Sequence, residues 1–160
     1  MSAGDYRAVA LRIRQEIVAL EEVAGRARAV WAEATGACDD YHVDATALNL
    51  HGFYAGLERV FVVVAERIDE SLPCGANWHQ ELLQQMSSEL PGVRPSVVSR
   101  SLAADLERFR GFRHVVRNVY AHVLDPRRIG ELMEALPGTL AAVHSQLADF
   151  ADALEAITQA

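Results

Sequence analysis

The sequence predicts an all-α protein, folded as an up-down helical bundle, on three observations. Apolar residues recur at steps of three and four along most of the chain, as they do on the buried face of a helix. No segment alternates convincingly between apolar and polar residues, as a half-buried strand would. Segments that contain proline and glycine separate the periodic stretches. We therefore expect four long helices and two short ones in a single domain that spans residues 1–160.

The first two helices are predicted to be long. One apolar stripe begins at Tyr6, and its helix is expected to end near Gly36. A second stripe occupies residues 43–69. Gly52 and Gly56 fall on one side of that second helix, where their missing side chains would let another helix approach closely. We therefore give these two glycines a packing role.

A short helix and another long one are predicted next. The break SLPCGAN at residues 71–77 interrupts the helical period, and a short helix is then expected to run to Leu90. After a second break, Ser96 or Ser99 can cap a long helix. That helix must stop before Pro126, because proline disfavours helical geometry in the residue that precedes it.

The last part of the chain is expected to hold one short helix and one longer helix. Asp125 and Pro126 make a suitable cap and first-turn pair for the short helix, which should run to Leu136. The pair Pro137-Gly138 is expected to break it. The final apolar stripe then occupies residues 140–157.

Composition and the cysteines exclude several classes of protein. Hydrophobic residues make up 51% of the chain and charged residues 23%, a balance typical of folded soluble proteins. The first residues include acid and arginine and lack the apolar run of a signal peptide or a membrane span, so we expect a cytoplasmic protein with no membrane association. Cys38 and Cys74 lie far apart, with no histidine at a zinc-ligand spacing. We expect two free thiols, no metal site and no cofactor.

Charge is unevenly distributed along the chain. The net charge is -7, yet residues 94–128 contain eight arginines and three acidic residues, which makes this segment +5 and the rest of the chain -12. Every basic residue other than histidine is arginine, whose planar fork binds phosphate with two parallel hydrogen bonds. An alanine- and arginine-rich chain is equally typical of a GC-rich genome. If the arginines do bind phosphate, this basic segment is where a functional face is expected.

The segment RGFRHVVRNVYAH, residues 110–122, ends the long helix of this basic region. Helical spacing puts five of its polar residues opposite the core stripe: Arg110, Arg113, His114, Arg117 and Asn118. We expect this face to be solvated and positive. The alternative is that it is an ordinary solvated helix face.

Residues 117–122, RNVYAH, resemble the Arg-x4-6-His signature of the HEPN superfamily, many of whose members are metal-independent ribonucleases. With 15 arginines and 6 histidines in 160 residues, one exact spacing is expected about 0.6 times by chance and the three permitted spacings together about 1.7 times, so context must add specificity. An asparagine follows the arginine, the motif closes a long helix, and a proline follows four residues after the histidine. A longer resemblance, from about residue 53 to 137, runs through FYAGLERVFVVVAERID, LPCGANWHQELLQQM and RFRHVVRNVY to the HepT-like branch of that superfamily.

The resemblance implies a HEPN-like bundle, a ribonuclease toxin and a small nucleotidyltransferase antitoxin as its partner. HepT proteins usually carry a tyrosine two residues after the motif histidine, and the partner can modify it with adenylate. Leu124 occupies that position here. Control by tyrosine adenylylation is therefore not expected.

The chemistry of RNA cleavage assigns roles to the motif. RNA is cut without a metal when its own 2′-hydroxyl is deprotonated and attacks the neighbouring phosphate. We predict His122 as the general base or acid and Arg117 as the cation that stabilises the transition state. Asn118 would orient the histidine or the phosphate. Three further residues are candidates for RNA binding: Arg110, Arg113 and His114.

Helix geometry bears on how this site is completed. Five residues along a helix turn about 500°, which leaves Arg117 and His122 roughly 140° apart around the axis. Either the helix unwinds before Pro126, or a second chain completes the site; we favour a homodimer whose two motifs meet in a cleft. The alternative function is a non-catalytic helical subunit that docks on a nucleotidyltransferase or binds a nucleotide.

Overall fold

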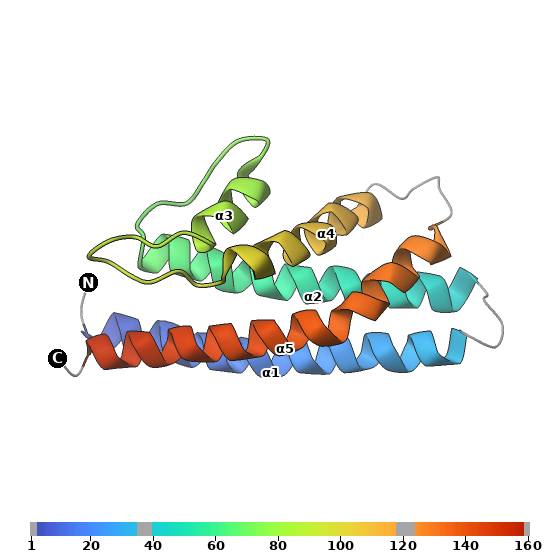
Figure 1. The fold of residues 1–160 in the computed structure, drawn as a ribbon, viewed down its shortest axis with the longest axis horizontal. Coiled ribbons are helices and arrows are strands. Elements are labelled where there is room, and N and C mark those ends of the chain that lie inside the picture. Colours follow the sequence, from blue (N-terminus) through green and yellow to red (C-terminus); the bar gives the residue numbers. More distant parts are fainter. Residues whose placement is uncertain (1–2, 35–39, 118–123, 159–160) are drawn as a thin grey trace.

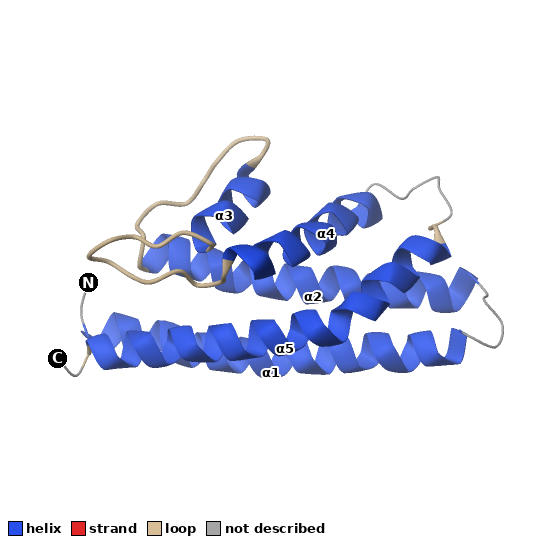
Figure 2. Cartoon of the chain, viewed as in Figure 1, coloured by secondary structure: helices blue, strands red, loops and turns tan. Residues whose placement is uncertain are grey.

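The computed structural model describes residues 3–34, 40–117 and 124–158. These residues form five helices: α1 (Ala3–Ala34), α2 (Asp40–Arg67), α3 (Trp78–Met86), α4 (Arg100–Arg117) and α5 (Pro126–Ile157). The four long helices run alternately up and down, and α3 lies beside α2 and α4 (Figure 1). Figure 2 shows helices joined by loops throughout the described part of the chain. The prediction of an all-α up-down bundle is confirmed.

Helices α1 and α2 pack closely because α2 presents glycine to α1. A Cβ atom added at Gly56 would lie 2.9 Å from the Leu20 Cδ2 atom, and one at Gly52 would lie 3.6 Å from the Val23 Cγ1 atom. The first distance is shorter than real Cβ contacts, so only glycine fits at position 56 without a shift of Leu20. The predicted packing role of these two glycines is confirmed.

The starts of α4 and α5 follow local capping rules. Ser99 Oγ accepts a hydrogen bond from the Leu102 backbone N–H at 3.1 Å, so Ser99, one of the two predicted caps, caps α4. At α5, Asp125 Oδ1 accepts from the Arg127 N–H at 3.0 Å, and Pro126 is the first helical residue. Both starts were predicted.

The predicted break at Pro137-Gly138 is wrong. Helix α5 continues through Pro137, so the chain has one short helix, α3, among its described residues instead of the two expected. Pro137 is exposed and costs α5 one backbone hydrogen bond. Leu136 before it and Val143 after it are both buried in the same core, and this packing holds the helix together across the proline.

A buried ion pair fixes the connection between α3 and α4. The Arg94 guanidinium donates to both oxygens of the Asp69 carboxylate, and both side chains are fully buried. Arg94 also donates to the backbone carbonyls of Ser88 at 3.0 Å and Gln85 at 3.2 Å. Because Asp69 follows α2 and Gln85 belongs to α3, this one side chain ties α3 to the end of α2.

Among the described helices, no segment combines the length and the apolar character that crossing a membrane requires.

Candidate functional site

The C-terminal half of α4 carries most of the predicted site residues. Arg117 is the last residue of α4, while Asn118 and His122 lie outside the described residues. Arg110, Arg113 and His114 lie on the last two turns of the helix before Arg117. These residues and the side chains that pack against them form the candidate site.

Two arginines of this face, Arg110 and Arg113, are not simply solvated. Arg113 Nη1 donates to Glu58 Oε1 of α2 at 2.8 Å, and the Arg113 side chain is only 16% exposed. Arg110 donates through Nε to Glu107 Oε2 at 2.8 Å, within α4. The expectation of an open, positive face is wrong for both residues: α2 supplies the buried Glu58 carboxylate to Arg113, and Glu107 of α4 itself pairs with Arg110. His114 is exposed, as expected.

The second oxygen of Glu58 binds a histidine from α3. Glu58 Oε2 lies 2.6 Å from His79 Nδ1, and the two side chains are 7% and 23% exposed. A carboxylate that also accepts from Arg113 is ionised, so the shared proton resides on Nδ1 and is donated to Glu58. His79 has no partner at a diagnostic spacing in the sequence, so the sequence pattern did not single it out and its partner was missed. The available signal was Glu58 itself, a charged residue within the apolar stripe of α2.

A small pocket opens beside this histidine. It has a volume of about 30 Å³ and is lined by four basic residues: His79, Arg110, Arg113 and His114. That volume holds roughly two water-sized groups. The Trp78 ring stacks on the His79 ring with a centroid separation of 3.6 Å and a tilt of 30°, which restricts how the imidazole can turn. The pocket can thus receive one or two oxygen atoms of an anion.

The family model described as "HepT-like protein" matches residues 45–154, from the first turns of α2 to near the end of α5. This chain belongs to the HepT-like family. HepT-like proteins are a branch of the HEPN superfamily, and the family is associated with ribonucleases and with nucleotidyltransferase antitoxin modules. No curated protein and no solved structure matches the chain.

In this HepT-like protein, two buried polar atoms near Glu58 lack partners among the described residues. Tyr54, one turn before Glu58, is buried, and its hydroxyl has no hydrogen-bond partner there. Burial raises the pKa of the Tyr54 phenol above its ordinary value, and the negative charge of Glu58 adds to the effect. Arg113 Nε is also buried without a partner in the described structure. The guanidinium of Arg113 therefore keeps a donor that Glu58 does not use.

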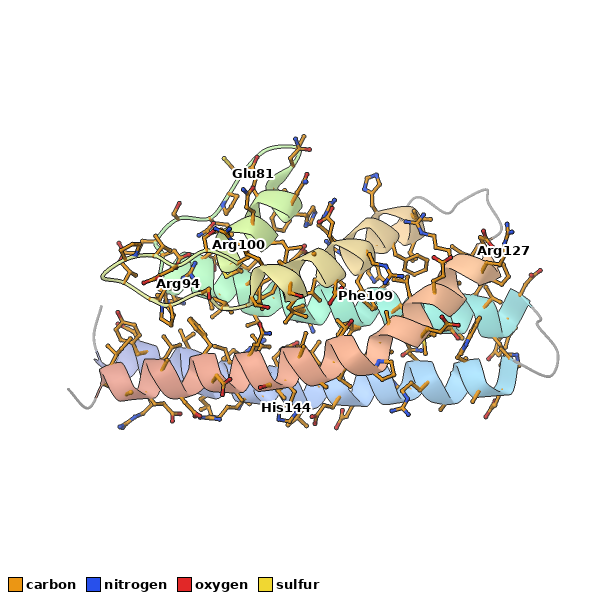
Figure 3. The ribbon with its side chains drawn as sticks, in the orientation of Figure 1. Glu81, Arg94, Arg100, Phe109, Arg127 and His144 are labelled. Atoms are coloured by element: carbon orange, nitrogen blue, oxygen red, sulfur yellow. The ribbon has the colours of Figure 1, made fainter. Side chains whose placement is uncertain are left out.

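The start of α5 brings further basic groups to the end of α4. The Arg128 guanidinium lies 5.9 Å from the centre of the Phe112 ring, over α4. Arg127 is exposed beside it and marks the start of α5 in Figure 3. Leu124, where HepT proteins usually carry tyrosine, is buried in the core. Its side chain is thus unavailable to a partner as well as chemically unable to accept adenylate.

Cys74 is a free, exposed thiol, and Cys38 lies outside the described residues. Within the described ranges, no three His, Cys, Asp or Glu residues are grouped so that they could hold a metal ion.

Proposed function

We propose that this protein is a metal-independent endoribonuclease, the toxin of a toxin-antitoxin module whose antitoxin is a nucleotidyltransferase-type protein. The observation that carries the proposal is the Arg117-x4-His122 sequence motif, which begins at the last residue of α4, in a chain of the HepT-like family. The substrate is RNA in the cytoplasm. The basic pocket one turn before Arg117 supports the proposal, because it offers donors to a phosphate.

In this mechanism the RNA supplies its own nucleophile. His122 moves a proton, either from the 2′-hydroxyl or to the leaving 5′-oxygen. Arg117 stabilises the extra negative charge on the phosphorus centre, and Asn118 orients the histidine or the phosphate. Three residues of the pocket contact the RNA: Arg110, Arg113 and His114.

The active form we propose is a homodimer. On a regular helix, residues five positions apart such as Arg117 and His122 would point about 140° apart, so two motifs that meet in a cleft would present both groups to one phosphate. Leu124 removes the usual site of adenylylation, so the antitoxin must neutralise this toxin in another way, and covering the cleft is the simplest.

Cleavage of RNA by the purified protein in the presence of a chelator tests this function. We expect the parent to cut, and Arg117→Ala and His122→Ala each to lose about 100-fold or more of the rate. Arg100→Ala is the matched control, because Arg100 is exposed at the opposite end of the same helix, roughly 25 Å away. Cleavage that both motif substitutions leave intact would rule out the site.

A second function is favoured by one observation. Glu58 and Glu107 already neutralise two of the arginines that would hold RNA. The same bundle could then be a non-catalytic subunit that docks on a nucleotidyltransferase or binds a nucleotide. A parent protein that cuts no RNA and does not slow growth when expressed alone would favour this function.

A further inference from the structure

We propose that His79 is the general base of this ribonuclease and that Glu58 is the residue that positions it. The inference rests on the proposed function and assigns a residue of α3 to the reaction, outside the motif. It divides the proton transfers between two histidines: His79 takes the proton from the 2′-hydroxyl, and His122 gives one to the leaving oxygen.

The hydrogen bond from His79 to Glu58 determines which nitrogen can act. Nδ1 carries its proton toward Glu58 Oε2 at 2.6 Å, so Nε2 holds the lone pair in the neutral ring. Arg113 Nη1 lies 3.1 Å from Nδ1 as well. Because both atoms are donors, they do not hydrogen-bond to each other; each donates to the Glu58 carboxylate. Stacking on Trp78 then holds the ring in its plane.

The charges around His79 suit a base that becomes an imidazolium during the reaction. From α2, the Glu58 carboxylate stabilises the cation as it forms, as a buried carboxylate does for the histidine of hydrolytic triads. From α4, Arg110, Arg113 and His114 line the same pocket and favour an anionic substrate there. Arg110 and Arg113 are each paired with a glutamate that partly neutralises their charge. They can therefore bind an anion while they add little net positive charge beside His79.

The pocket lies one helical turn from the motif. Arg113 and Arg117 are four residues apart on α4, which places their backbones on the same side of the helix and about 6 Å apart along its axis. A phosphodiester that spans this distance can place one group in the pocket and its phosphorus near the motif. The 30 Å³ of the pocket suits a hydroxyl and one phosphoryl oxygen rather than a base or a sugar.

The reaction is a balanced transesterification. His79 Nε2 accepts the 2′-hydroxyl proton while the 2′-oxygen forms a bond to phosphorus. The bond from phosphorus to the 5′-oxygen breaks, and that oxygen takes a proton from the His122 imidazolium. The products are a 2′,3′-cyclic phosphate and a 5′-hydroxyl, and no oxidant, reductant or metal takes part.

A second histidine-glutamate pair in this chain is more exposed than the pair of His79 and Glu58 and serves as a comparison. His144 Nδ1 of α5 lies 2.5 Å from Glu21 Oε1 of α1, but these side chains are 53% and 43% exposed. Figure 3 shows His144 on the side of α5 away from α3. His79 lines the small basic pocket described above, whereas His144 and Glu21 form an exposed pair on the surface of α5 and α1. His144→Ala is therefore the matched control for His79→Ala.

Two dinucleotide substrates separate a base from an acid. One is an ordinary ribodinucleotide; the other carries sulfur in place of the 5′-oxygen, and the thiolate leaves without needing a proton. We expect His79→Ala to slow cleavage about 100-fold or more on both substrates, because the 2′-hydroxyl must be deprotonated in each. His122→Ala should be slow on the ordinary substrate and close to the parent on the sulfur substrate. Added imidazole should restore part of the His79→Ala rate, and His144→Ala should match the parent.

Each result has one meaning. If His79→Ala cuts the ordinary substrate within twofold of the parent, or recovers on the sulfur substrate as His122→Ala does, His79 is not the base, although the ribonuclease function stands. His79→Gln keeps an amide donor for Glu58; a slow but stably folded His79→Gln supports the proposal, and a fully active one overturns it. A parent that cuts neither substrate overturns the proposed function, and this inference with it.

Discussion

Replacement of Glu58 by alanine should destabilise the protein strongly, because this carboxylate is the common partner of two groups. It accepts from Arg113 at 2.8 Å and from His79 at 2.6 Å while being 7% exposed. Removing one member of a buried ion pair costs about 3–5 kcal/mol, since the remaining charge stays buried and unpaired. Arg113 and His79 are 16% and 23% exposed, so some water reaches them and we expect about 3 kcal/mol.

Urea unfolding followed by circular dichroism at pH 7 measures this loss. Glu21→Ala, which breaks the exposed pair with His144, is the matched control and should cost less than about 1 kcal/mol. A double-mutant cycle with Arg113→Ala should give a coupling of at least about 1 kcal/mol. The reasoning fails if Glu58→Ala costs no more than Glu21→Ala, or if the cycle shows no coupling, because either result would mean that the pair is solvated in solution.

Two further predictions concern the buried Tyr54 and the proposed homodimer. Burial raises the pKa of Tyr54, so the unfolded chain ionises this phenol at a lower pH than the folded protein does. The contribution of the neutral phenol to the free energy of unfolding is therefore complete below the ordinary pKa of 10.0 and is lost as the pH rises above it. Tyr54→Phe should therefore lose less stability than the parent between about pH 10 and 12 in urea unfolding; equal slopes would contradict the burial argument. For the proposed dimer, mixing Arg117→Ala with His122→Ala chains should restore about a quarter of the parent activity, since half of random dimers are mixed and each holds one intact site. If no activity returns, each site is made of one chain.

Features that depend on a few neighbouring residues were predicted well. The stripes of α1 and α2 need only the 3.6-residue period, and the Ser99 and Asp125 caps need only the backbone N–H groups two or three residues ahead. Gly56 was assigned its packing role from its spacing to Gly52. Pro137 shows the limit of local rules. A proline inside a helix costs a few kcal/mol of stability. In α5, burial of the apolar residues on either side of Pro137 outweighs that cost.

The sequence by itself determined the class of fold, the family resemblance, and the basic C-terminal half of α4. The tertiary structure alone decided what those arginines do. Glu58 is 55 residues from Arg113 and 21 from His79, so no spacing rule joins them. They meet because apolar burial packs α3 and α4 against α2, and the one carboxylate within the apolar stripe of α2 must then find cationic or donor partners in that interface. The same burial that made the helices predictable thus created a pairing that the sequence pattern did not reveal.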